Sequence, residues 1–215
     1  MGTLIWFLIL CGSIYAILTK SPGSKPKTKF NYNDWFESVC LNSDDLINFL
    51  SKLQNDDALC EFIESQKGAI LKYNGKIISD PKDKLKQFLI MDVAKCYVIM
   101  GYSPSSNSRR SIPFFLFYSK LTDRDIKVNI ENIDSFMQKC QESFGSISTQ
   151  LVNSVSKSSD VFFIAEYLKH YNLDALHEYI RILLEFGYKV AGAEGKVSKT
   201  NDQQLDIIFN YTRVG

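Results

Sequence analysis

The stretch DPKDKLKQFLIMDVAKCYVIMG, residues 80–101, decides the fold class. Asp80 offers a side-chain oxygen that can cap a helix, and Pro81 follows where its missing N–H costs nothing. Apolar residues then recur at the spacing of a helix with one buried face: Leu85, Phe88, Leu89, Val93, Tyr97 and Met100. The stretch therefore predicts an α-helix that begins at Pro81 and ends near Gly101.

Helical spacing of apolar residues recurs along most of the chain after residue 32. It predicts helices over residues 33–54, 56–65, 159–170 and 175–190, and a last helix that begins at Ser198. Asn74-Gly75 lies between two short β-prone runs and favours a two-residue hairpin turn. The predicted fold class is mainly α: an N-terminal transmembrane helix, then a cytoplasmic helical bundle with one small β-hairpin.

The first 19 residues carry no charged side chain and form a nearly continuous apolar run. As a helix they would reach roughly 28 Å, close to the hydrocarbon thickness of a bilayer. A cleaved signal peptide would need a basic residue before the apolar run, and none is there. A core helix would not be followed by a solvated linker. The sequence therefore predicts an uncleaved membrane anchor.

Four lysines follow the apolar run and predict the orientation of the anchor. They lie in a Pro-, Gly- and Ser-rich linker: Lys20, Lys25, Lys27 and Lys29. Positive residues favour the cytoplasmic side and also anionic headgroups, so the body of the chain is expected in the cytoplasm. The predicted organisation is an anchor (1–19), a linker (20–32), a small helical lobe with the hairpin (33–80) and a helical bundle (81–215).

The charge balance argues against nucleic-acid binding. The chain has 25 basic and 24 acidic residues and a net charge of +1, but residues 30–215 alone carry −3. Binding to phosphates needs an excess of Lys and Arg. The acids of the first lobe instead predict a face for a basic protein partner: Asp44, Asp45, Asp56 and Asp57. Arg109 and Arg110, in a serine-rich loop, either contact phosphate or headgroups or are simply solvated.

Two apolar or charged features have both a structural and a functional interpretation. The run from Ile112 to Tyr118 is a buried segment or a partner-binding patch, and the core is the default for so many aromatic residues. Asp92 lies on the exposed stripe of its helix, paired with Lys95, or is a buried functional acid; the spacing favours the pair.

The five cysteines are odd in number and contain no CxxC, so we expect free thiols.

The segment from Ala191 to Ser198 lies between two predicted helices and resembles a turn of the TerB-like family of tellurite-resistance and stress modules. Ala193, Gly195, Val197 and Ser198 match that turn. Glu194 replaces the aspartate of the family pattern, and Asn201 lies where a glutamate is expected. A second, degenerate copy runs from residue 122 to residue 126. The resemblance covers roughly residues 83–212 and implies an all-α bundle.

The resemblance also implies roles for several acidic residues. In the family, acids of these turns are linked to metal binding, which would assign a divalent cation to Asp123, Asp125, Glu131, Glu194 and Asp202. The altered acids count against that assignment, and the spacing after Asp123 does not fit a calcium loop. No cofactor other than such a cation, and no catalytic residue, is predicted.

The expected function is a membrane-anchored cytoplasmic protein-interaction module, a scaffold or sensor in a stress- or defence-related membrane complex. Its partners would be the bilayer and proteins that the sequence does not identify. The alternative is an oligomeric membrane effector whose anchors form a pore, with Gly12 and Ala16 allowing close helix contact. A metal-dependent enzyme that uses Asp92 or the acids near Asp123 is a third hypothesis.

Overall fold

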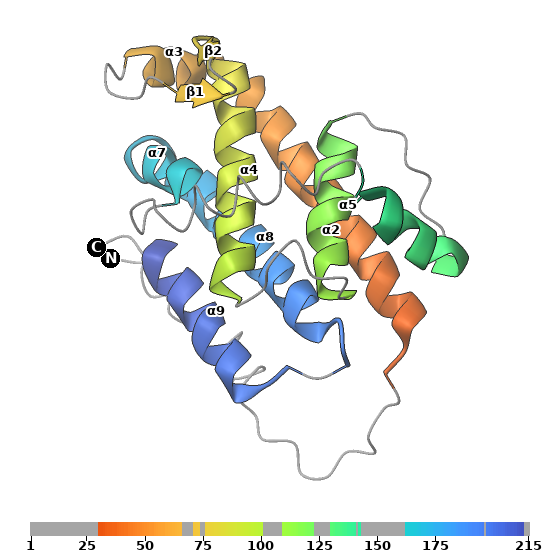
Figure 1. The fold of residues 1–215 in the computed structure, drawn as a ribbon. Coiled ribbons are helices and arrows are strands. Elements are labelled where there is room, and N and C mark those ends of the chain that lie inside the picture. The colour runs from red at the N-terminus through yellow and green to blue at the C-terminus, as the bar shows by residue number, and fades with distance from the viewer. Residues whose placement is uncertain are drawn as a thin grey trace. The chain divides into compact units, whose positions relative to one another are not determined.

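The structure, a computed structural model, describes residues 30–65, 71–73, 76–100, 109–122, 130–140, 142, 162–195 and 197–212. Its described part is mainly helical (Figure 1). None of the described helices is both long and apolar enough to cross a membrane. The predicted anchor (1–19) and the lysine-rich linker up to Lys29 lie outside the described residues.

The predicted helices are present within a few residues of their expected bounds, and α5, whose segment was predicted only as core or as a partner patch, is a further helix. They are α2 (Tyr32–Gln54), α3 (Asp57–Ser65), α4 (Pro81–Ile99), α5 (Ile112–Leu121), α7 (Phe163–Tyr171), α8 (Leu173–Gly192) and α9 (Lys199–Thr212). Short 3₁₀ turns η1 (Arg109–Ser111) and η2 (Ile130–Asn132) precede α5 and a helical segment at 133–140. The Asp80 carboxylate accepts a hydrogen bond from the amide of Lys82 at 2.7 Å, which confirms the predicted cap of α4.

The hairpin predicted from Asn74-Gly75 is present as two short strands. β1 (Leu71–Tyr73) pairs antiparallel with β2 (Lys76–Ile78), and Leu71 lies opposite Ile78. This register leaves two residues between the strands, as the Asn-Gly signal requires. The turn residues themselves lie outside the described residues.

The helices from Asn31 onward belong to one compact unit. In Figure 1, α8 passes behind α4, with α7 and α9 on one side of α4 and α2 and α5 on the other. α2 packs on α5 and α8, so the predicted lobe (33–80) shares its core with the predicted bundle (81–215). Long-range packing of α2 therefore removes any structural boundary at residue 80.

Aromatic residues fill the centre of the unit. Every residue of α5 except Lys120 is buried, which confirms the interpretation of 112–118 as core rather than as a partner patch. A helix that is apolar on all sides belongs in the interior, and the surrounding α2, α4 and α8 bury it. The largest fully buried side chains include Tyr97, Tyr179, Phe49, Phe88 and Phe186.

Candidate functional site

Asp92 is fully buried at the junction of α4, α7 and α8. Its carboxylate accepts hydrogen bonds from the amide of Phe163 at 2.7 Å, from the amide of Ile164 at 2.9 Å and from the hydroxyl of Tyr179 at 2.8 Å. The prediction that Asp92 lies on an exposed stripe is therefore wrong. The reason is tertiary: α7 and α8 cover the face of α4 that the local pattern assigns to solvent.

The two amides belong to the first turn of α7, which has no capping side chain of its own. The residue before α7 is Phe162, whose side chain makes no cap hydrogen bond. Asp92 satisfies two of the orphan N–H groups from another helix, 71 and 72 residues earlier in the chain. A carboxylate at a helix N-terminus is also favoured by the helix dipole. Asp92 thus caps α7 across the fold.

Burial and the polar neighbours of this carboxylate shift its pKa in opposite directions. Burial raises the pKa of Asp92 to about 7, whereas the hydrogen bonds from Ile164, Tyr179 and Phe163 and the charge on Lys95 lower it. Burial and the nearby Asp92 raise the pKa of the Tyr179 hydroxyl well above its usual value. Lys95 is itself buried, with its ammonium 5.3 Å from the centre of the Phe162 ring.

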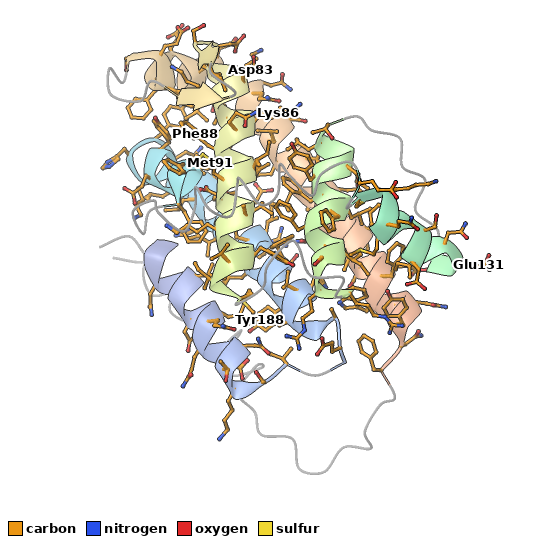
Figure 2. All side chains as sticks on the ribbon, in the orientation of Figure 1. Asp83, Lys86, Phe88, Met91, Glu131 and Tyr188 are labelled. Carbon is orange, nitrogen blue, oxygen red and sulfur yellow. The ribbon has the colours of Figure 1, made fainter. Side chains whose placement is uncertain are left out.

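Side chains around Asp92 close the site to solvent. Figure 2 shows Phe88 on the side of α4 that faces α7, and its ring stacks on Phe163 with centroids 5.2 Å apart. Cys96 directs its thiol to the carbonyl of Leu183 at 3.6 Å. Since Asp92 is fully enclosed, its geometry suits an internal anchor and proton site.

The acids proposed for a metal are not gathered in the described part of the chain. Asp123 and Asp125 lie outside the described residues. Glu131 projects from the exposed end of its helical segment (Figure 2), Glu194 pairs with Arg110, and Asp202 is exposed in the first turn of α9. Among described residues, no group of three His, Cys, Asp or Glu side chains could hold a metal ion.

The turn between α8 and α9 has the local geometry that its sequence predicts. Gly195 adopts a positive φ of 83°, which a residue with a side chain rarely tolerates, and its amide bonds to the carbonyl of Gly192 at 2.9 Å. Ser198 caps α9 through its hydroxyl, which lies 3.2 Å from the amide of Asn201. Asn201 in turn accepts a hydrogen bond from the amide of Ser198 at 3.0 Å. The pair forms a capping box.

Two of the four predicted interaction acids have partners within the fold. Asp44 forms an ion pair with Lys120 of α5 at 2.5 Å. Asp56 caps α3 through the amide of Leu59 at 3.0 Å and accepts the hydroxyl of Tyr171 at 2.8 Å. Asp45, half-buried, and Asp57, exposed, take part in no hydrogen bond or ion pair shown by the described residues. Of these four acids, Asp44 and Asp56 therefore have partners within the fold, and Asp44 is also exposed at the surface.

The two arginines of η1 lie near the start of α2 and the α8–α9 turn. Arg109 places its guanidinium 4.7 Å from the centre of the Tyr32 ring, while Arg110 pairs with Glu194. Both side chains therefore have protein contacts rather than being simply solvated. The lysines predicted to flank the membrane, from Lys20 to Lys29, lie outside the described residues.

Sequence reasoning missed an exposed stripe along α2. It contains the outward-facing residues at helical spacing: Asp34, Glu37, Leu41, Asp44 and Asn48. We call these five residues the α2 stripe. Leu41 exposes 65% of its surface, the most of any large hydrophobic residue in the described chain. The signal in the sequence was a lone leucine among acids on the polar side of a helix.

No protein-family model matches the chain, and neither the curated proteins nor the solved structures include one with significant similarity to it.

Proposed function

We propose that the chain is a membrane-anchored cytoplasmic protein-interaction module whose α2 stripe binds a basic partner. The observation that carries the proposal is Leu41, a large apolar side chain that protrudes between acids one turn away on each side. An apolar anchor within a ring of charges is a common arrangement for a binding residue, because the charges select the partner and the anchor stabilises the complex.

The charges of the stripe define the chemistry of that partner. Asp34, Glu37 and Asp44 are exposed. Lys120 forms an ion pair with Asp44. A basic amphipathic helix complements this pattern, because its apolar face can cover Leu41 while its basic side chains face the acids. α2 suits such a partner because it is 23 residues long, roughly 34 Å, and its first turn is capped by Asn31.

The membrane anchor is the second part of the proposal, and it is supported by the uncharged run 1–19 and the lysines after it. The linker between residue 19 and Tyr32 can span at most about 45 Å when extended. The α2 stripe would then lie within reach of other proteins of the same membrane. A scaffold or sensor in a stress- or defence-related complex is the role that the TerB-like resemblance implies.

Membrane attachment is tested by fractionation of cells that make the full chain. Alkaline carbonate should leave the chain in the membrane pellet, and a Leu8→Lys, Ile14→Lys double variant should release it to the supernatant. A C-terminal reporter that is active only in the cytoplasm tests the orientation. Release of the unaltered chain by carbonate would contradict the anchor without bearing on the stripe.

The stripe is tested by photo-crosslinking in intact membranes. A photoreactive amino acid replaces Leu41 in one variant and Leu173, which is 49% exposed at the start of α8, in a matched control. We expect a discrete adduct at position 41 only, and its loss when Glu37→Lys and Asp34→Lys are added. No adduct at position 41, or the same adducts at both positions, would contradict the proposal. An adduct between two copies of the chain would favour the oligomeric effector instead.

A further inference from the structure

We propose that Asp92 is a proton-controlled latch that holds the first turn of α7 against α4 and α8. The geometry carries the proposal: one carboxylate from α4 receives two successive amides of α7 and the hydroxyl of Tyr179 on α8. The latch is independent of the proposed membrane anchor and of the α2 stripe.

Attachment of α7 depends on this contact because the helix is short and has no side-chain cap of its own. α7 has nine residues, and an isolated helix of that length is not stable in water. Its first turn is therefore held by packing and by the two bonds to Asp92. A helix whose cap comes from an ionisable group in the interior is suited to respond to protons.

The ionisable groups that act on Asp92 come from two helices. Lys95 lies on its own helix, α4, and Tyr179 lies on α8. Burial and the nearby Asp92 in turn raise the pKa of the Cys96 thiol, which is also on α4. α7 contributes backbone amides to the carboxylate, and two of its charged side chains, Glu166 and Lys169, pair with each other. Within the described residues, the titration of the latch is therefore that of Asp92 modified by Lys95 and Tyr179.

The direction of the response follows from proton linkage. In the closed state the pKa of Asp92 is about 7, and when α7 opens the carboxyl meets water and returns to its ordinary value near 3.8. The closed state therefore binds a proton that the open state releases between these two pH values. Closure is strongest in acid, weakens as pH rises through about 7, and does not change further above that.

Release of α7 would uncover aromatic residues on two other helices. Phe163 stacks on Phe88 of α4, and Tyr171 stacks on Phe62 of α3 with centroids 6.0 Å apart. The Tyr171 hydroxyl also binds Asp56 at the α2–α3 corner. An open latch thus exposes apolar surface on α3 and α4. Loss of the buried proton from Asp92 would therefore change the surface of the protein.

Hydrogen exchange on the full chain in detergent micelles tests the latch. Rates at pH 5.5 and pH 7.5 are corrected for intrinsic exchange and compared for peptides that cover α7 and, as the internal control, α9. We expect protection of the Phe163 and Ile164 amides to fall at least about tenfold between the two pH values. α9 should keep the same protection at both.

Two variants separate the latch from general loosening. Asp92→Asn cannot ionise, so the pH dependence of α7 should disappear. Tyr179→Phe removes a donor that favours the carboxylate, so the midpoint should move to higher pH; this readout holds even if the first variant does not fold. The proposal is overturned if α7 protection is independent of pH, if the Tyr179→Phe midpoint stays in place, or if α7 and α9 lose protection together.

Discussion

The indole nitrogen of Trp35 donates a hydrogen bond to the carbonyl oxygen of Lys189 across 3.0 Å, which ties the start of α2 to the end of α8. The two residues are 154 positions apart in the chain. Tyr32 stacks on the same indole with ring centroids 5.3 Å apart. The first described helix is thus fixed near the turn that leads into α9.

Trp35→Phe removes that donor and keeps most of the aromatic packing. We expect the free energy of unfolding to fall by about 1 kcal/mol, the usual net value of one intramolecular hydrogen bond. Urea unfolding followed by circular dichroism measures it. Trp6→Phe, in the predicted anchor, is the control and should leave the unfolding of the helical body unchanged. Equal stability of Trp35→Phe and the unaltered chain would contradict the contribution of this bond.

The capping box at the start of α9 gives a second prediction. Ser198→Ala and Asn201→Ala should each lower stability by about 1 kcal/mol, and the double variant should cost less than the sum because the two side chains bond to each other. Asn201→Glu should retain the box, since glutamate is the usual residue at this position. Thermal unfolding of the four variants beside Thr200→Ala, an exposed neighbour, checks this. Strict additivity would argue against a reciprocal pair.

These caps also show which parts of the fold the sequence could predict. The starts of α4 and α9 were predicted correctly because Asp80 and Ser198 act on amides two or three residues away. The hairpin was predicted for a similar reason, since an Asn-Gly pair in the sequence favours a two-residue turn between neighbouring strands. Signals of this kind are local and can be recognised without knowledge of the tertiary structure.

The role of Asp92 could not be predicted because its partners lie 71 to 87 residues further along the chain. The local pattern offered only Lys95 as a partner and so assigned Asp92 to solvent. Asp44 and Asp56 show the same limitation, since their partners Lys120 and Tyr171 are 76 and 115 residues away. Burial of a charged residue is decided by which helix covers it, and one helix's periodicity does not contain that information.

Gly187 allows α9 to approach α8 closely, which gives a third prediction. A Cβ at this position would lie 2.7 Å from the Leu205 Cδ2 and 3.6 Å from the Cys96 Sγ, whereas one at Gly192 would lie 3.8 Å from the Trp35 ring. Gly187→Ala should lower stability by about 1 kcal/mol despite its better helix propensity, because overpacking costs more. Gly192→Ala, the control in the same helix, should be neutral or stabilising.

A double-mutant cycle separates overpacking at Gly187 from a backbone effect. Leu205→Ala removes the side-chain carbon that the new Cβ would meet, so Gly187→Ala should cost little or nothing in that background. Urea unfolding of the two single variants and the double variant measures the coupling. If Gly187→Ala costs the same in both backgrounds, the close approach of Leu205 is not the reason for the glycine.

The buried carboxylate of Asp92 predicts how the stability of the whole unit depends on pH. Its pKa is about 7 in the folded chain and near 3.8 when unfolded, so it contributes stability that is fully present below 3.8 and lost as pH rises through 7. Subtracting the unfolding free energy of Asp92→Asn from that of the unaltered chain isolates this term. The difference should fall by up to ~4 kcal/mol between pH 4 and pH 7.5, at 1.36 kcal/mol per unit of pKa. A difference that stays nearly constant over this interval would mean that the hydrogen bonds from Phe163, Ile164 and Tyr179 outweigh burial and that Asp92 is ionised throughout, because a lowered pKa changes stability only below about 3.8.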